Sequence, residues 1–300
     1  MKNNVLIVGS GALATLFAAR LAQAGVTVTM LATWENGLAA LNTSGARLIL
    51  PDGREICQPV HAVSTPEDCR GARLALVLVK AWQTGRAARQ LAACLAPDGV
   101  ALTLQNGLGN RETLIESLGA ERVALGVTTS GATLLGPGLT RSGGEGLLSL
   151  EAHSRLQALE VLLRRANFQV DILPDAKTLV WGKLVINTAI NPLTALLGIP
   201  NGELLKRRGA RAVMEALARE TAQVAAACGA HLPFDDPVQA AEEVAQKTAA
   251  NRSSMFQDVC RGAPTEIDAI CGAVVRAARE KGLATPVNWV MWQLISVQTE

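Results

Sequence analysis

The chain has 300 residues, of which 49% are hydrophobic, 18% are charged and only 3% are aromatic, with no tyrosine. Its 28 basic and 26 acidic residues give a formal net charge of +2, which argues against a nucleic-acid-binding protein, because such a protein needs a clustered excess of lysine and arginine. The length favours two domains. A core of alanine, leucine and valine favours helices and buried parallel strands over a β-sandwich.

The six cysteines form no CxxC pair, and no cysteine–histidine cluster has the spacing of metal ligands. We therefore expect buried free thiols and no metal site. No apolar run reaches the roughly 18 residues of a membrane span, because the best candidate, residues 178–199, contains Lys183 and Pro192. The N-terminus shows no signal-peptide pattern. The expectation is a cytoplasmic protein with no membrane or nucleic-acid partner, either a monomer or a homodimer.

The first part of the chain alternates short apolar strands with helices. We expect, in chain order, strand 4–9, helix 12–24, strand 26–31, a hairpin with Pro51-Asp52-Gly53 as its turn, strand 73–79, helix 83–96, strand 100–104, helix 110–118 and strand 122–129. Glycine-rich residues 131–146 are expected to form loops or a β-ribbon, before strand 147–151, helix 154–166 and strand 168–173. This alternation predicts a doubly wound, Rossmann-type α/β domain over residues 1–174.

From residue 175 onward the hydrophobic pattern is helical only. The expected helices are 176–191, 201–229, 236–249, 263–281 and 286–297. An all-helical C-terminal domain over residues 175–300 follows. The densest basic run, Lys206-Arg207-Arg208, is best explained as a solvated helix face.

The segment Gly9-Ser10-Gly11-Ala12-Leu13-Ala14 has the pattern GxGxxA between an expected strand and an expected helix, and this context indicates a dinucleotide-binding turn. Gly9 permits the tight turn, Gly11 lets the backbone approach a pyrophosphate, and the small Ala14 lets the helix lie close to the strand. The helix N-terminus would offer free amides to the phosphates. All six residues are candidate cofactor contacts. The alternative, an ordinary glycine turn, explains the spacing and flanks less well.

The second strand ends in Leu31-Ala32-Thr33-Trp34-Glu35, without the carboxylate that an NAD site usually carries at the tip. Its absence favours NADP(H), whose 2′-phosphate a carboxylate would repel. No arginine stands there either. Thr33 could donate a hydrogen bond, so it is a candidate cofactor contact, and the residues leave the choice between NADP(H) and NAD(H) open.

Two more polar residues follow expected strands. Lys80 comes after strand 73–79, and Asn106 comes after strand 100–104. Ligands of open α/β sheets bind at the carboxyl ends of the strands, so we expect both residues to face the ligand crevice. A solvated loop lysine is the alternative for Lys80.

Lys183, Asn187 and Asn191 are spaced i, i+4 and i+8 along an otherwise apolar helix. At 100° per residue they fall within about 80° of arc and share one face. Without a polar partner they would incur a desolvation cost of a few kcal/mol, and a substrate carboxylate and carbonyl would supply that partner. Partial burial would lower the pKa of Lys183 and suit it to act as a general acid towards a ketone oxygen. The alternative is a structural network between the two domains.

A second polar cluster is Asn251-Arg252-Ser253-Ser254-Met255, followed by Thr265-Glu266-Ile267-Asp268. Asparagine and serine side chains bind carboxylates and hydroxyls. Glu266 follows Pro264 at the start of an expected helix, where a carboxylate is favoured by the helix dipole. The sequence is equally compatible with this structural role and with a role of Glu266 in a site.

The motifs GSGALA, VKAWQ, QNGLGN, WGKLVINTAINPLTAL, PNGEL, NRSSMFQD and TEID, in this order, make nearly the whole chain similar to the ketopantoate reductases (2-dehydropantoate 2-reductases). The resemblance implies reduction of 2-dehydropantoate to pantoate with NADPH, in pantothenate and coenzyme A biosynthesis. It implies that Lys183 is the catalytic proton donor. It also implies substrate contacts from Asn106, Asn187, Asn191, Asn201, Asn251 and Ser254, and cofactor contacts from Lys80, Asn106 and Glu266.

One position departs from the family pattern. Members often carry arginine at the end of the second strand to bind the 2′-phosphate, and the matching position here is about Ala32. This departure allows NADH or mixed cofactor use.

Three functional hypotheses follow from the sequence. The first is this reductase, with hydride passing from the nicotinamide to the ketone carbon and Lys183 protonating the oxygen. The second is a reductase of another small branched 2-oxo acid. The third is a nucleotide-sensing regulatory protein without turnover, which would have no need of the Lys183, Asn187, Asn191 and Ser254 set.

Overall fold

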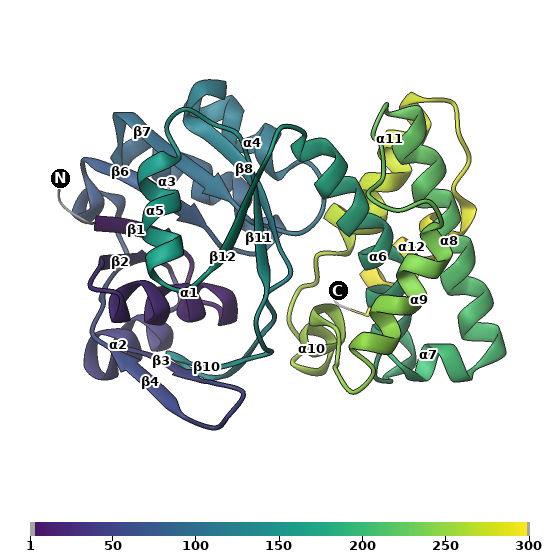
Figure 1. The fold of residues 1–300 in the computed structure, drawn as a ribbon, viewed down its shortest axis with the longest axis horizontal. Coiled ribbons are helices and arrows are strands. Elements are labelled where there is room, and N and C mark those ends of the chain that lie inside the picture. Colours follow the sequence, from purple (N-terminus) through teal and green to yellow (C-terminus); the bar gives the residue numbers. More distant parts are fainter. Residues whose placement is uncertain (1–3, 299–300) are drawn as a thin grey trace. The chain divides into compact units, whose positions relative to one another are not determined.

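The computed structural model describes residues 4–298, and these divide into two compact units, each with its own apolar core (Figure 1). The first unit comprises the chain up to Gln105 together with Asn110–Ala176. The second comprises Asn106–Gly109 together with the chain from Lys177 onward. The short segment Asn106–Gly109 therefore packs with the second unit, although the chain on both sides of it belongs to the first.

The first unit is built on an eight-stranded sheet in the order β12-β11-β8-β7-β6-β1-β2-β5. Its strands are β1 (Asn4–Val8), β2 (Thr27–Leu31), β5 (His61–Val63), β6 (Ala72–Val77), β7 (Leu95–Thr103), β8 (Val123–Thr128), β11 (Leu147–Glu151) and β12 (Gln169–Leu173). Neighbouring strands are parallel except that β11 runs antiparallel to β8. A smaller sheet, in the order β4-β3-β10-β9, is formed by β3 (Ala46–Ile49), β4 (Glu55–Gln58), β9 (Ala132–Gly136) and β10 (Leu139–Ser142).

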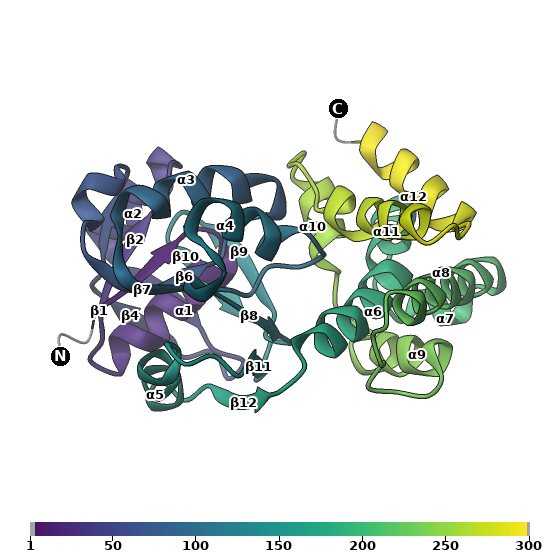
Figure 2. The same ribbon diagram turned by 90° about the horizontal axis from the view of Figure 1, so that it is seen from above.

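Alternate residues of each central strand enter different cores, because successive side chains of a strand point to opposite faces. On β1, Val5 and Ile7 join the core that contains Phe17, whereas Leu6 and Val8 join the core that contains Leu91. Helices α1 (Ala12–Gln23) and α5 (Gln157–Arg165) cover the first face, and α3 (Thr84–Cys94) and α4 (Asn110–Leu118) cover the other (Figure 2). Burial on both faces makes the strands near-continuous apolar runs.

These observations confirm the doubly wound, Rossmann-type fold and the hairpin, which is β3 paired antiparallel with β4. Residues 131–146 contain a β-ribbon, β9 paired antiparallel with β10. The sheet is mixed rather than purely parallel, since β11 and β12 run opposite to the rest. A helix that the sequence analysis did not predict, α2 (Glu35–Ser44), lies between β2 and β3.

The described part of the second unit contains helices joined by loops, and no strand. Its elements are α6 (Ala176–Leu197), α7 (Glu203–Lys206), α8 (Arg208–Ala227), α9 (Pro237–Lys247), α10 (Ser254–Cys260), the π-helical turn η4 (Asp268–Gly272), α11 (Ala273–Glu280) and α12 (Pro286–Val297). The apolar face of α6 contributes Leu184, Val185 and Leu193 to the core of this unit.

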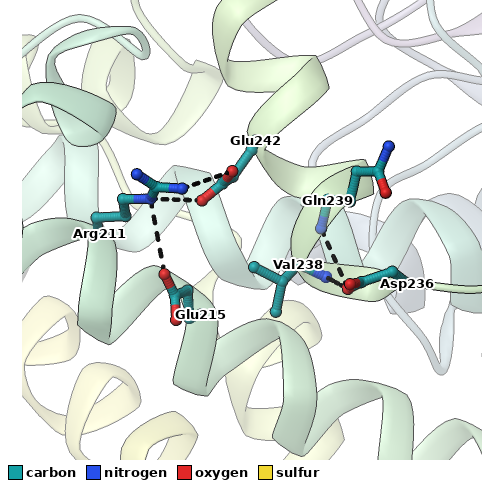
Figure 3. Close-up of polar contacts among 6 residues, drawn as sticks. All are labelled: Arg211, Glu215, Asp236, Val238, Gln239 and Glu242. Atoms are coloured by element: carbon teal, nitrogen blue, oxygen red, sulfur yellow. Dashed lines mark hydrogen bonds and ion pairs between the residues drawn. The ribbon is translucent and has the colours of Figure 1, made fainter.

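Polar contacts fix the start of α9 and its position beside α8. The Asp236 carboxylate accepts hydrogen bonds from the amides of Val238 and Gln239, which caps α9 (Figure 3). Arg211 of α8 donates two hydrogen bonds to Glu242 of α9 and lies 3.6 Å from Glu215 (Figure 3). A bidentate pair fixes geometry as well as adding energy, so these contacts hold α9 alongside α8.

Four features of this unit differ from the expected helices. The first expected helix continues past Pro192 to Leu197, and the second is interrupted at Arg207 between α7 and α8. The segment 254–260 forms α10, which the sequence analysis did not predict. The expected helix 263–281 contains the π-helical turn η4 before it becomes α11.

All six cysteines are free, as expected, but the expectation that they are buried is wrong for Cys57 and Cys260, which are exposed. Burial raises the pKa of the Cys69 thiol to about 12 and that of Cys94 to about 11, so neither is a reactive thiolate at neutral pH. Among residues 4–298, no helix combines the length and the apolar character that crossing a bilayer requires.

Candidate active site

The glycine-rich turn between β1 and α1 has the geometry of a phosphate cradle. Gly9 has φ +127°, and a Cβ there would lie 3.0 Å from the Leu78 carbonyl oxygen, so only glycine fits the turn. Gly11 precedes α1 with φ −78° and no side-chain cap, and a Cβ on it would meet no atom within 4 Å. Ala14 is fully buried. Open space beside uncapped helix amides fits a dinucleotide pyrophosphate.

The end of β2 offers neither a cation nor a carboxylate at the tip. Ala32 is buried and its amide donates to the Val63 carbonyl. Thr33 is exposed, as are Trp34, which packs on Gly37, and Glu35, which lies in the first turn of α2. Within residues 31–36, therefore, Thr33 supplies the one hydroxyl close to the strand end.

A hydrogen-bonded network joins the ends of β6 and β7. The Gln105 amide donates to the Val79 carbonyl at 3.0 Å and to the Thr84 hydroxyl at 2.8 Å, and Thr84 donates to Asn110 at 2.7 Å. Lys80 follows Val79 directly and is partly buried. The network positions the backbone on which Lys80 stands. The sequence analysis assigned no role to Gln105, although a glutamine directly after a buried strand is a usable signal.

The helical spacing predicted for Lys183, Asn187 and Asn191 is present, because all three lie on the continuous helix α6. Asn191 is buried, and Lys183 and Asn187 are partly buried. Burial lowers the pKa of Lys183 to about 8, while the nearby Glu266 carboxylate acts in the opposite direction. A lysine with this pKa is suited to give up a proton near neutral pH.

Asn106 and Glu266 come together from positions 160 residues apart in the chain. The Asn106 Nδ2 donates to Glu266 Oε2 at 2.9 Å, and Glu266 is only 6% exposed. Since Glu266 also acts on Lys183, an amide, a carboxylate and an ammonium form one cluster in the second unit. We refer to Asn106, Lys183 and Glu266 as the polar triad.

The remaining predicted substrate residues form a second group in the same unit. The Asn201 backbone N–H donates to the Asn251 backbone carbonyl at 3.0 Å, and the Asn201 side-chain Nδ2 donates to the Thr248 hydroxyl at 2.8 Å. Ser253 caps α10 and accepts a hydrogen bond from Thr194 at 2.7 Å. The side chains of Asn251 and Ser254 are exposed.

The structure thus divides the predicted site residues between the two units. The first unit carries Gly9, Ser10, Gly11, Ala12, Leu13, Ala14, Thr33 and Lys80, and the second carries Asn106, Lys183, Asn187, Asn191, Asn201, Asn251, Ser254 and Glu266. The supporting roles of Thr248 and Ser253 were not predicted from the sequence. For Ser253 a signal was available, because a serine is favoured just before the start of a helix.

Known proteins resemble this chain over nearly its whole length. Residues 5–155 match the family model for Ketopantoate reductase PanE/ApbA, and residues 175–299 match the model for its C-terminal part. A 2-dehydropantoate 2-reductase of Halobacterium salinarum is 33% identical over 296 residues, which cover 97% of each chain.

Two solved structures share the fold over nearly the whole chain. The structure of a PanE/ApbA family ketopantoate reductase from Ralstonia eutropha JMP134 is 33% identical, with a TM-score of 0.92 and coverage of 99% of this chain and 98% of that one. A structure of D-mandelate dehydrogenase with NADH and anilino(oxo)acetate is 23% identical, with a TM-score of 0.93 and the same coverage of 99% and 98%. At that identity the second likeness concerns the fold alone.

Proposed function

Because the chain belongs to the ketopantoate reductase family, we propose that it reduces 2-dehydropantoate to pantoate with a nicotinamide dinucleotide. A bound nicotinamide dinucleotide would supply hydride to the ketone carbon, and as the carbonyl π electrons move to the oxygen, Lys183 would give that oxygen its proton. The product is a 2-hydroxy acid, and the lysine recovers its proton from water.

The observation that carries this proposal is the polar triad, in which Asn106 donates to the buried Glu266 carboxylate at 2.9 Å and burial beside that carboxylate lowers the pKa of Lys183 to about 8. Negative charge develops on the ketone oxygen as hydride arrives, and an ammonium placed there both stabilises and protonates it. A lysine with an ordinary pKa of 10.5 would hold its proton too tightly to transfer it efficiently at neutral pH. The triad therefore has the electrostatics of a general-acid site.

The other residues of the second unit have binding roles in this proposal. Asn187 and Asn191, on the same face of α6 as Lys183, would orient the carboxylate and carbonyl of the substrate. Asn251 and Ser254 are exposed and would bind the hydroxyl or carboxylate, with Asn201 supporting them through the Asn251 backbone. Glu266 and Asn106 would contact the nicotinamide ribose and the substrate.

The fit of the glycine turn supports a bound dinucleotide, with Gly9–Ala14 at the pyrophosphate and Thr33 near the ribose. When bound, that dinucleotide supplies the hydride. We propose NADPH as the natural reductant, with only weak discrimination against NADH, because residues 31–36 contain no arginine or lysine. An arginine–phosphate contact is worth about 1.5–3 kcal/mol, and without it we expect the two cofactors to differ by about tenfold or less in kcat/KM.

The decisive experiment measures oxidation of NADPH and of NADH, side by side, with 2-dehydropantoate and with a panel of other branched 2-oxo acids. The proposal expects the highest kcat/KM for 2-dehydropantoate. A higher value for another 2-oxo acid would assign the same chemistry to a different substrate. Cofactor binding without turnover of any 2-oxo acid would instead indicate the regulatory alternative and overturn the proposal.

A further inference from the structure

The segment Asn106–Gly109 approaches the π-helical turn η4 too closely for any side chain at Gly107. Gly107 has φ +84°, and a Cβ on it would overlap the Ala269 carbonyl, at 2.6 Å from the carbonyl carbon and 2.8 Å from the Ala269 Cβ. The next residue, Leu108, donates its amide to the same carbonyl oxygen at 3.0 Å. The backbone of this segment is therefore attached directly to the backbone of η4.

The segment just before η4 receives the side chain of the preceding residue, Asn106. Asn106 donates to Glu266 at 2.9 Å, and the Glu266 carbonyl accepts from the Ile270 amide at 3.0 Å as the turn begins. The loop is thus bonded at two points, to η4 itself through backbone atoms at Ala269 and, through the Asn106 amide, to Glu266, which lies two residues before η4. The Asn106 side chain can change its rotamer. The backbone contact at Gly107 fixes the position of the adjacent backbone from which that side chain extends.

The shape of η4 is also held by contacts outside the triad. Arg276 donates to the Asp268 carboxylate at 2.8 Å and 3.1 Å and to the Asp268 carbonyl at 2.9 Å. Its guanidinium also lies 5.6 Å from the centroid of the Trp292 ring. A π-helical turn inside a helix is uncommon and often marks a functional site, and here it carries the Ala269 carbonyl and, through the Ile270 amide, is hydrogen-bonded to the backbone of Glu266 just before it.

We infer that Gly107 is a positioning residue, whose close contact with the Ala269 carbonyl holds the Asn106 amide on Glu266 beside Lys183. The catalytic meaning of this contact rests on the proposed function. Any residue with a Cβ at position 107 forces the loop and η4 apart by about 1 Å before the atoms reach van der Waals contact. A displacement of that size in a positioning group costs on the order of a hundredfold in rate.

The test compares Gly107→Ala with Gly109→Ala. Gly109 has φ +90°, close to that of Gly107, but a Cβ on it would meet no atom within 4 Å. Both variants carry the same backbone strain of an alanine at positive φ, and only Gly107→Ala disturbs the contact with η4. We expect kcat/KM for 2-dehydropantoate to fall on the order of a hundredfold in Gly107→Ala and to stay within about threefold in Gly109→Ala. Equal falls in the two variants would overturn the inference.

A double-mutant cycle separates positioning from a general structural defect. If Gly107 acts through Asn106, then Gly107→Ala adds less than about threefold to the loss already caused by Asn106→Ala. A full hundredfold further loss in the Asn106→Ala background would show that Gly107 acts by another route, and the inference would fail.

If Gly107→Ala does not fold, a comparison of Arg276→Met with Arg279→Met tests whether the position of η4 affects catalysis through Asn106. Both arginines are exposed on α11, and Arg276 holds the η4 turn. We expect a larger fall in kcat/KM for Arg276→Met, and no such difference in the Asn106→Ala background. Equal activities of the two arginine variants would contradict the inference.

Crystal structures of the variants separate this inference from the proposed function. Absence of turnover in the unmodified protein would refute the proposed function. The positioning contact would then be tested by whether the Asn106–Glu266 hydrogen bond is present in the variant structures. Loss of the Asn106–Glu266 hydrogen bond in Gly107→Ala, with the bond intact in Gly109→Ala, would support the contact's role. The bond intact in both variants would overturn it.

Discussion

At the scale of single residues, the proposed chemistry depends on the protonation of Lys183. Its pKa, lowered to about 8 by burial, means that the side chain carries its proton below pH 8 and loses it above. Because the proposed reaction consumes that proton, we expect kcat/KM for reduction to be constant below about pH 8 and to fall towards tenfold per pH unit above it. Lys183→Met should lose on the order of 10²–10⁴ in kcat and keep its affinity for the cofactor.

Glu266→Gln identifies the group that titrates. The Glu266 carboxylate raises the pKa of Lys183, so its neutral isostere leaves the ammonium less stabilised and moves the alkaline fall in kcat/KM to lower pH. The pH profiles of the unmodified protein and of this variant provide the measurement. A fall that stays in place in Glu266→Gln, or that persists in the residual activity of Lys183→Met, would assign the titration to another group.

The residues that the sequence analysis identified are those whose signal is local. Gly9 and Gly11 are marked by a short motif next to a strand, and Lys183 and Asn187 by the helical period. Contacts between distant parts of the chain carry no such signal. The hydrogen bond from Asn106 to Glu266 spans 160 residues, and its position is set by the contact between a loop and η4 at Gly107.

At the scale of elements, the helices missed from the sequence are those held by tertiary contacts. The α2 segment contains Gly37 and ends in Asn42-Thr43-Ser44, all weak helix formers. Its end is fixed because the Asn42 side chain exchanges two hydrogen bonds with the Ala62 backbone, at 2.8 Å and 2.9 Å. The short helix α10 likewise depends on Ser253, which caps it and contacts Thr194.

Helix was also under-predicted at Pro192, a residue that stops a helix in isolation but not in α6. A proline inside a helix costs about 3 kcal/mol. Leu193 and Ala195, beyond the proline, are buried in the core of the second unit, and their burial offsets that cost. The periodicity of apolar residues beyond position 192 was therefore a better guide to the end of this helix than the proline.

Helix α12 begins at a carboxylate supplied by another helix. Glu220 of α8 accepts hydrogen bonds from the amides of Val287 and Asn288 and from the Asn288 side chain, each at 2.9 Å. We expect Glu220→Ala to lower the free energy of unfolding by about 2–3 kcal/mol, because three donors lose a charged acceptor at a helix N-terminus.

Glu215→Ala, on the same helix, is the matched control for Glu220→Ala. Glu215 makes one exposed contact of 3.6 Å with Arg211, and such contacts contribute about 0–1 kcal/mol. Urea unfolding of both variants gives the comparison. Equal destabilisation of the two variants would contradict the role assigned to Glu220.

At the scale of the whole molecule, the two units hold different parts of the proposed site. The unit that contains Gly9–Ala14 holds the expected cofactor contacts other than Asn106 and Glu266, and the unit built around α6 holds the proposed proton donor and the expected substrate contacts. Cofactor affinity and turnover should therefore respond to different substitutions. Lys183 lies in the second unit, so we expect Lys183→Met to leave the glycine turn of the first unit intact.

Gly11→Val tests this division through ligand-linked stability. The φ of −78° at Gly11 and the open space around its Cβ position allow valine without a clash, so unfolding of the cofactor-free protein should change by less than about 1 kcal/mol. At a cofactor concentration of 100 times Kd, the unmodified protein gains about 2.7 kcal/mol. Gly11→Val should lose this gain, because its side chain fills the space of the pyrophosphate, whereas Lys183→Met should keep it. Urea unfolding with and without NADPH measures both, and a gain retained in Gly11→Val would show that the dinucleotide does not bind at this turn.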